Sequence, residues 1–195
     1  MPNPRAGRQM RYIPAKIQHR DDGGEPVIAC YFAVFNSPTE LWPGCIEQIA
    51  PGAFSSSLGG DVRALVDHET RLVLGRTTAG TLTLREDESG LYGEIKINPN
   101  DSDAMNLYAR VQRGDVSQCS FGFEIVSEDY IVESDGQTCT WTIHDLILYE
   151  VSVVTFPAYE ATSAYARDAS DMASLRTARL NRRRQELLER INKLC

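Results

Sequence analysis

The sequence predicts a mainly β protein of the α+β class, with flanking helices around an antiparallel sheet or barrel. Short runs rich in β-branched and aromatic residues recur along most of the chain and are separated by turn residues, which is typical of antiparallel strands. Helical spacing of apolar residues occurs in one internal segment and near the C-terminus. Of the 195 residues, 42% are hydrophobic and 24% are charged, a balance that indicates one folded globular domain.

The predicted strands begin with the run VIACYFAVF at Val27–Phe35, which ends where Asn36-Ser37-Pro38 stops a strand. A short helical or 3₁₀ segment is expected at 51–60, between turn residues. The remaining expected strands are Met10–Ile17, Val62–Val66, Leu72–Arg76, Thr81–Arg85, Leu91–Asn98, Val116–Val126, Cys139–Leu148 and Glu150–Thr155. Their close spacing implies an antiparallel sheet or barrel.

Two helices are expected. The internal one begins after Asp101-Ser102-Asp103, which supplies N-cap oxygens, and ends at Gly114. The second spans Met172–Cys195, where leucine and isoleucine recur at helical spacing among arginines. This amphipathic helix either packs on its own barrel or on a second copy of the chain, which favours a homo-oligomer, or it serves as a docking or removable tail.

Three regions follow from these patterns. Residues 1–26 form a loose, proline-containing N-terminal leader, residues 27–166 form the β-barrel domain, and residues 167–195 form a helical tail. The sequence has no internal repeat and no low-complexity tract.

Composition excludes several classes of function. A net charge of −7 argues against bulk nucleic-acid binding, and no apolar run is long enough to span a bilayer. A cytosolic protein is therefore expected. Five widely spaced cysteines without a CxxC pair indicate neither a disulfide framework nor a zinc site, so we expect no metal and no cofactor.

Ser120 is the candidate nucleophile. Strand alternation places it on the face opposite the apolar side chains of its segment, and Gly122 beside it leaves space for a substrate backbone to approach. Cys119 points toward the interior by the same alternation and is a poor nucleophile. Because a single serine on a strand is usually not catalytic, periodicity alone does not establish this role.

A serine nucleophile needs a neighbouring base, and histidine is the usual one. His68 lies at the end of a predicted strand and has the required chemistry, although a structural role is also open. Glu150 lies in a near-continuous apolar run, where a carboxylate must be paired. It either orients a catalytic histidine or forms a buried salt bridge with an arginine. His144 could replace it as the third member, and His19 is expected to be exposed in the leader.

Five sequence blocks carry a family resemblance over about Ala29–Ala164. They are Tyr31-Phe32-Ala33-Val34-Phe35-Asn36, Ile49-Ala50-Pro51-Gly52-Ala53-Phe54, Asp67-His68 followed by Leu74-Gly75-Arg76, Ser120-Phe121-Gly122-Phe123, and Leu148-Tyr149-Glu150-Val151-Ser152-Val153-Val154-Thr155-Phe156-Pro157-Ala158. In this order they make the chain resemble the phage prohead (capsid maturation) serine proteases of the HK97 type.

The resemblance implies a serine endopeptidase with a closed or partly open barrel similar to herpesvirus assemblins. It implies Ser120 as nucleophile, His68 as base and Glu150 as third member, with His144 kept open by the second histidine of assemblins. The implied partners are the major capsid protein and its scaffold segment, inside an assembling prohead in the bacterial cytoplasm, and the implied activity includes self-cleavage. The rival hypotheses are a non-catalytic β-barrel that assists shell assembly and a cysteine hydrolase that uses Cys119.

Overall fold

The strands of the protein form two sheets in a computed structural model that describes residues 5, 7–14, 17–20, 26–133 and 138–156. The chain divides into two compact units, 1–160 and 161–195, and the second lies outside the described residues, as does the predicted helix Met172–Cys195. The elements are β1 (Gln9–Pro14), β2 (Gln18–Arg20), β3 (Val27–Val34), β4 (Thr39–Trp42), β5 (Cys45–Ile49), β6 (Arg63–Val66), β7 (Glu69–Arg76), the 3₁₀ turn η1 (Thr77–Ala79), β8 (Leu82–Glu86), β9 (Gly90–Lys96), α1 (Ser102–Arg113), β10 (Gln118–Val132) and β11 (Cys139–Val154).

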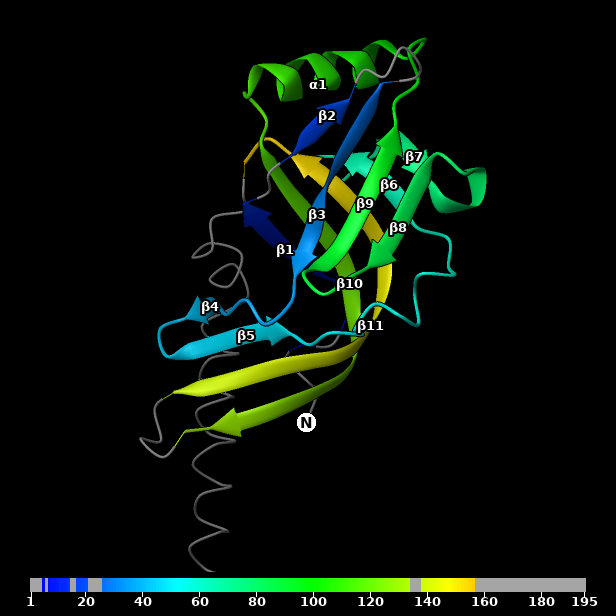
Figure 1. The fold of residues 1–195 in the computed structure, drawn as a ribbon. Coiled ribbons are helices and arrows are strands. Elements are labelled where there is room, and N and C mark those ends of the chain that lie inside the picture. The colour runs from blue at the N-terminus through cyan, green and yellow to red at the C-terminus, as the bar shows by residue number, and fades with distance from the viewer. Residues whose placement is uncertain (1–4, 6, 15–16, 21–25, 134–137, 157–195) are drawn as a thin grey trace, which may run out of the picture. The chain divides into compact units, whose positions relative to one another are not determined.

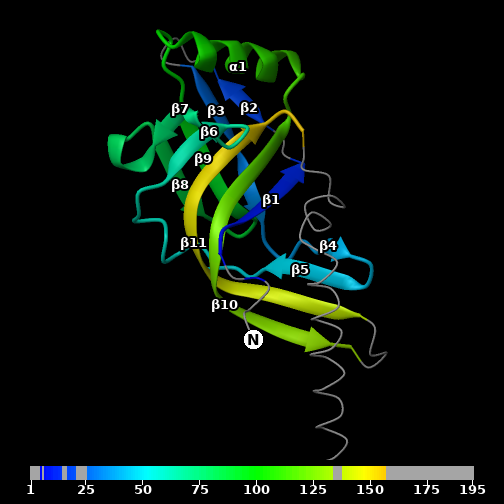
Figure 2. The same ribbon diagram turned by 180° about the vertical axis from the view of Figure 1, so that it is seen from behind.

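β11 is the centre of the larger, seven-stranded sheet (Figures 1 and 2). It pairs with β10 along most of its length, and β1 pairs with the other edge of β10. The first half of β11 runs parallel to β5, and its last residues run parallel to β6. The smaller sheet has the order β2-β3-β9-β8 and is antiparallel throughout.

The predicted antiparallel barrel is corrected in two respects. The described strands form two separate sheets and no closed barrel, and two of the pairings are parallel. The coarser prediction, a mainly β protein with one internal helix, is confirmed for the described part of the chain.

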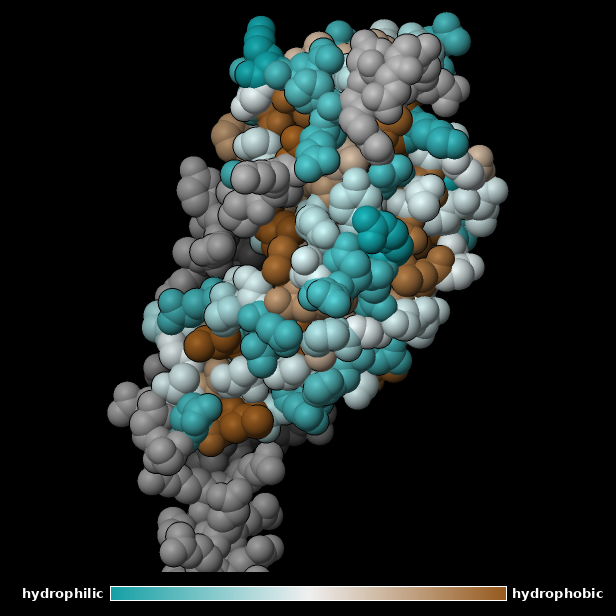
Figure 3. All heavy atoms as spheres, viewed as in Figure 1, coloured by the Kyte–Doolittle hydropathy of each residue, from teal (hydrophilic) through white to brown (hydrophobic). Residues whose placement is uncertain are grey.

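One apolar core joins the two sheets and α1. The inward side chains of the larger sheet include Cys119, Phe121 and Phe123, and those of the smaller sheet include Phe32 and Ile95. On the surface shown in Figure 3, apolar residues form small patches separated by hydrophilic ones. None of the described helices is long and apolar enough to cross a membrane.

The helix α1 forms for the reasons that the sequence gives. The Asp101 carboxylate accepts hydrogen bonds from the backbone N–H groups of Asp103 and Ala104, and Gly114 ends the helix at a φ of 84°. The apolar stripe of α1 is buried against the core and consists of Ala104, Leu107, Tyr108 and Val111.

The interruption predicted between Leu148 and Glu150 is a bulge within one strand. Gly122 pairs with Glu150 and the next residue, Phe123, pairs with Leu148, so Tyr149 is the extra residue on β11. The bulge lets Leu148 and Val151 both face the core. The predicted helical segment at 51–60 consists of turns, and the strands β4 and β5 were not predicted.

A disulfide joins Cys45 and Cys139, although the cysteine pattern of the sequence indicated no disulfide framework. The two residues are directly paired across the parallel strands β5 and β11. Trp141 packs beside the bridge and lies in edge contact with Trp42. Cys45 and Cys139 are 94 residues apart in the sequence, and for this reason the cysteine spacing gave no indication of the pair.

Candidate active site

His68 lies on a two-residue turn between β6 and β7. Asp67 and His68 have φ values of 47° and 60°, the left-handed conformation that both central residues of a type I′ hairpin turn require. The Asp67 carboxylate accepts hydrogen bonds from Thr155, at 2.7 Å from the backbone nitrogen and 2.8 Å from Oγ1. The backbone N–H of Asp67 donates to the carbonyl of Val153 at 3.1 Å. These contacts hold the turn, and with it His68, against the end of β11.

Glu150 holds the imidazole of His68. Its Oε1 lies 2.7 Å from His68 Nδ1, and its Oε2 accepts a hydrogen bond of 2.6 Å from the Ser152 hydroxyl. Ser152 Oγ also lies 3.3 Å from His68 Nδ1. Glu150 is 1% exposed, so this carboxylate has hydrogen bonds on both oxygens in a buried setting.

Ser120 lies in the same row of side chains. It is the cross-strand partner of Ser152 on one side and of Tyr12 on the other, which directs the three side chains to one face of the sheet. This face is opposite the core, where Cys119 and Phe121 point. Although it lies outside the core, Ser120 is 0% exposed. Alternation therefore predicted the face of Ser120 but not its burial.

Two buried polar atoms in this site have no hydrogen-bond partner, Ser120 Oγ and His68 Nε2. Buried polar atoms without a hydrogen-bond partner are uncommon, and two of the three found among the described residues belong to the predicted nucleophile and base. Nδ1 and Nε2 thus differ in surroundings: one faces Glu150, and the other is without a partner.

Tyr12 contacts both residues from β1. Its ring packs edge-on against the His68 imidazole, with ring centroids 5.4 Å apart. Burial raises the pKa of the Tyr12 phenol, the negative charges of Glu150 and Asp67 raise it further, and the nearby Ser120 hydroxyl, which does not meet the geometry of a hydrogen bond, lowers it in part. At neutral pH the phenol therefore stays protonated.

Gly122 was expected to leave space for a substrate backbone, but the space beside it is filled by protein side chains. A Cβ at this position would lie 2.4 Å from Glu150 Oε1 and 3.2 Å from the Nε and Nη2 atoms of Arg8. Arg8 Nη2 lies 3.6 Å from Glu150 Oε1, and the Arg8 guanidinium lies over the Tyr149 ring. The missing side chain lets the carboxylate come close to β10.

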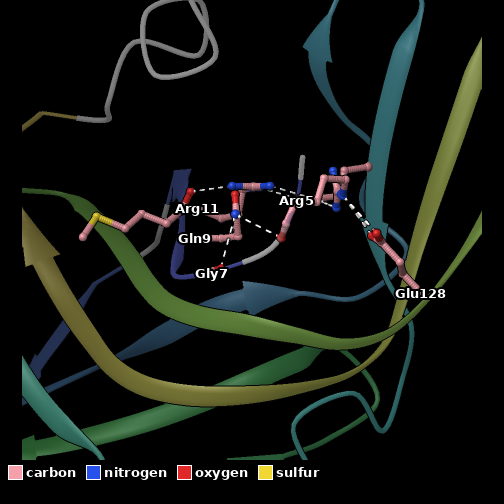
Figure 4. A network of polar contacts seen from close by, with 7 residues as sticks. Arg5, Gly7, Gln9, Arg11 and Glu128 are labelled. Carbon is pink, nitrogen blue, oxygen red and sulfur yellow. Dashed lines mark hydrogen bonds and ion pairs between the residues drawn. The ribbon is translucent and has the colours of Figure 1, made fainter. Parts of the chain in front are cut away.

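A buried ionic network fixes the N-terminal segment that carries Arg8 and Tyr12 (Figure 4). Glu47 on β5 binds both Arg5 and Arg11, with 2.8 Å between Arg11 Nη2 and Glu47 Oε2. The Nε of Arg5 also donates to Glu128 Oε2 at 2.9 Å.

The pKa values of the two carboxyl groups in this network, Glu47 and Glu128, are shifted in opposite directions. Burial raises the pKa of Glu47, but Arg11 and Arg5 together outweigh burial and hold it below the usual value. Burial also raises the pKa of Glu128, where Arg5 only partly offsets it and the nearby charge of Glu47 raises it again. Among the described residues, Glu47 accepts hydrogen bonds from both arginines, whereas Glu128 accepts them from Arg5 alone, and the charge of Arg11 is the smallest of the causes that act on the pKa of Glu128.

The other candidate residues have different surroundings. His144 is exposed, and its Nε2 lies 2.9 Å from Asp129 Oδ2. Cys119 is fully buried with its sulfur 2.9 Å from that of Cys30. Burial raises the pKa of the Cys119 thiol well above its usual range, and the contact with Cys30 raises it further, which disfavours the thiolate that a cysteine nucleophile requires.

Comparison with known proteins assigns the family. The family model described as caudovirus prohead serine protease matches residues 14–175. The chain belongs to this family. The prohead protease of Enterobacteria phage HK97 is 31% identical over 172 residues, which cover 86% of this chain and 72% of that protein. The structure of the bacteriophage T4 capsid assembly protease aligns with a TM-score of 0.47 and 8% identity, over 75% of this chain and 96% of that one.

Membership of the prohead serine protease family makes the chain a peptidase and disfavours a non-catalytic assembly protein. The sequence alone did not single out Ser152, Tyr12, Arg8 or the contact between Asp67 and Thr155. Ser152 could have been found from its spacing, because it lies two residues after Glu150 on the same strand. The others depend on strand pairings that the sequence does not reveal.

Proposed function

We propose that the chain is a serine endopeptidase that cleaves the major capsid protein and its scaffold segment during prohead maturation. In this proposal Ser120 is the nucleophile, His68 the general base and Glu150 the acid that orients the base. The observation that carries the proposal is the asymmetry of His68, whose Nδ1 lies 2.7 Å from Glu150 while its Nε2 and the Ser120 Oγ are buried without partners.

The surroundings of Nδ1 favour one tautomer of a neutral His68. A carboxylate oxygen only accepts hydrogen bonds, so the contact of 2.7 Å needs a proton on Nδ1. The lone pair is then on Nε2, the atom that must receive a proton from serine. Glu150 therefore supports base catalysis by fixing the proton distribution of the ring.

The reaction follows from this distribution. His68 Nε2 takes the proton of the Ser120 hydroxyl while Oγ bonds to the carbon of the scissile peptide, which gives a tetrahedral intermediate. The intermediate collapses as the protonated imidazole gives its proton to the leaving amine, and a serine ester remains. Water, activated by the same Nε2, hydrolyses the ester and regenerates the free serine.

Substrate access requires a local movement. Ser120 is 0% exposed, so a peptide carbonyl can reach Oγ only after neighbouring groups shift. Tyr12 is the side chain that contacts both Ser120 and His68. We expect Tyr12 to move when a substrate binds, inside the assembling prohead.

The proposal is tested by co-expression of the protein with its capsid protein. Wild type should shorten the capsid protein, whereas Ser120→Ala and His68→Ala should leave it intact and His144→Ala should retain cleavage. Cleavage by Ser120→Ala would refute the assignment. Loss of cleavage after thiol alkylation would favour Cys119 instead.

Self-cleavage is a further part of the proposal and concerns the tail at 167–195. Intact-mass measurement of the purified protein should show a shorter C-terminus for wild type and a full-length one for Ser120→Ala. A full-length C-terminus in wild type that still cuts the capsid protein would contradict self-cleavage.

A further inference from the structure

Ser152 is a second serine in the site, with a different environment from that of Ser120. It is 0% exposed and lies on the same face of β11 as Glu150, opposite Ser120 in the strand pairing. Among the described residues, its hydroxyl is the hydrogen-bond donor to Glu150 Oε2, at 2.6 Å. We propose that Ser152 is a positioning residue that fixes the Glu150 carboxylate and, through it, the Nδ1–H tautomer of His68.

A serine hydroxyl has one hydrogen and can therefore donate only one hydrogen bond. The short contact to a carboxylate assigns that hydrogen to Glu150 Oε2. Ser152 Oγ then presents a lone pair toward His68 Nδ1, 3.3 Å away. Nδ1 therefore faces two acceptors, Glu150 Oε1 and Ser152 Oγ. Both favour a proton on Nδ1 and leave Nε2 free to accept one.

Ser152 also opposes an alternative orientation of Glu150. Arg8 Nη2 lies 3.6 Å from Oε1 and is a charged competitor for the carboxylate. With Ser152 holding Oε2, rotation of Glu150 toward Arg8 breaks a charge-assisted hydrogen bond. Without the hydroxyl, Oε2 is buried without a donor, and the carboxylate is free to turn away from His68.

This inference rests on the proposed function, because it assigns a role to Ser152 in the same reaction. We expect Ser152→Ala to lower kcat by roughly 10- to 100-fold, the range expected for one charge-assisted hydrogen bond, with KM within about twofold. The assay uses a peptide that spans the mapped capsid cleavage site. Ser152→Thr keeps a hydroxyl and should restore most of kcat, whereas Ser152→Cys, a weak donor of similar size, should behave like Ser152→Ala.

A spectroscopic readout separates positioning from loss of fold. In protein labelled with ¹⁵N-histidine, the wild-type His68 ring should show a protonated Nδ1 and an unprotonated Nε2, assigned by comparison with His68→Gln. Ser152→Ala should populate the Nε2–H tautomer, and Ser152→Thr should return the wild-type pattern. These spectra need no substrate and do not depend on activity.

Ser57 provides a matched control. It is also a buried serine, but its hydroxyl binds only backbone groups, with contacts of 2.8 Å to Leu146 O and 2.9 Å to Leu148 N. Ser57→Ala should lower stability and leave the His68 spectrum and kcat unchanged. A Ser152→Ala variant with wild-type spectrum and wild-type kcat would overturn the role of Ser152, even if Ser120→Ala and His68→Ala are inactive. If Ser120→Ala remained active, the proposed function itself would fail.

Discussion

Gly122→Ala is expected to disrupt the site by inserting a single methyl group. The new Cβ would lie 2.4 Å from Glu150 Oε1, about 1 Å closer than the roughly 3.3 Å of a normal carbon–oxygen contact. The methyl group cannot move independently of β10, so the carboxylate must move instead. A shift of that size is enough to break its hydrogen bonds of 2.7 Å to His68 and 2.6 Å to Ser152.

The expected loss of stability follows from these two hydrogen bonds. Each charge-assisted hydrogen bond contributes about 1.5–3 kcal/mol, and Glu150 regains part of this by turning toward Arg8. We therefore expect Gly122→Ala to lower the free energy of unfolding by about 3 kcal/mol. Displacement of the acid by about 1 Å should also reduce kcat/KM by on the order of 100-fold.

Urea denaturation and peptide cleavage measure the two effects separately. Gly59→Ala is the matched control, because no heavy atom lies within 4 Å of a Cβ built there. It should change stability by no more than about 0.5 kcal/mol and leave cleavage unchanged. If Gly122→Ala retained both the stability and the cleavage rate of wild type, the packing of Glu150 against β10 would be incorrect.

Three further predictions concern the elements that surround the site. Asp67→Ala should lower the free energy of unfolding by about 2–3 kcal/mol, because it removes two hydrogen bonds to Thr155 and a residue type that tolerates positive φ. Urea denaturation should show a much smaller loss of stability for Asp67→Asn. Equal losses would contradict that account. Although burial raises the pKa of Glu47, its arginine partners hold it below the usual 4.5, so its contribution to stability is complete above about pH 5 and is lost as the pH falls through the lowered value. Glu47→Gln should therefore flatten the acid side of the stability curve between pH 7 and 3, and an unchanged slope would refute this assignment. Reduction of the bridge between Cys45 and Cys139, which closes a separation of 94 residues, should remove up to about 4–5 kcal/mol of stability and lower Tm, with no effect of reductant on a Cys45→Ser and Cys139→Ser double variant. A wild-type Tm that does not respond to full reduction would be inconsistent with a stabilising bridge.

Elements with local causes were predictable from the sequence. The helix α1 has its cap at Asp101, its apolar stripe and its terminating Gly114 within one short segment, so no distant residue is needed to specify it. The break in periodicity beside Tyr149 was also visible, but a bulge and a turn give the same sequence pattern. Only the pairing of β10 with β11 distinguishes them.

Features set by non-local pairing were not predictable. β5 is a short strand with the polar residues Glu47 and Gln48, and it is stabilised by parallel pairing with β11 about a hundred residues later in the chain. The disulfide between Cys45 and Cys139 depends on the same register. A pattern within one segment contains no information about which distant strand lies beside it.

The candidate site also contains residues that were predictable from the sequence and contacts that were not. His68 and Glu150 could be proposed from residue type and family blocks, and the structure has them in hydrogen-bond contact. The sequence could not show that Tyr12 of the predicted leader lies against Ser120, because this contact follows from the antiparallel register of β1 and β10. The sequence also gave no reason to expect that Ser120, the proposed nucleophile, is fully buried.

Covalent labelling tests the central claim most directly. Diisopropyl fluorophosphate is a small probe that reacts with a serine activated by a neighbouring base, and peptide mapping locates the adduct. Wild type should carry one adduct, on Ser120, and both Ser120→Ala and His68→Ala should carry none. An adduct on another residue, or undiminished labelling of Ser120 in His68→Ala, would contradict the proposal that these two side chains act together.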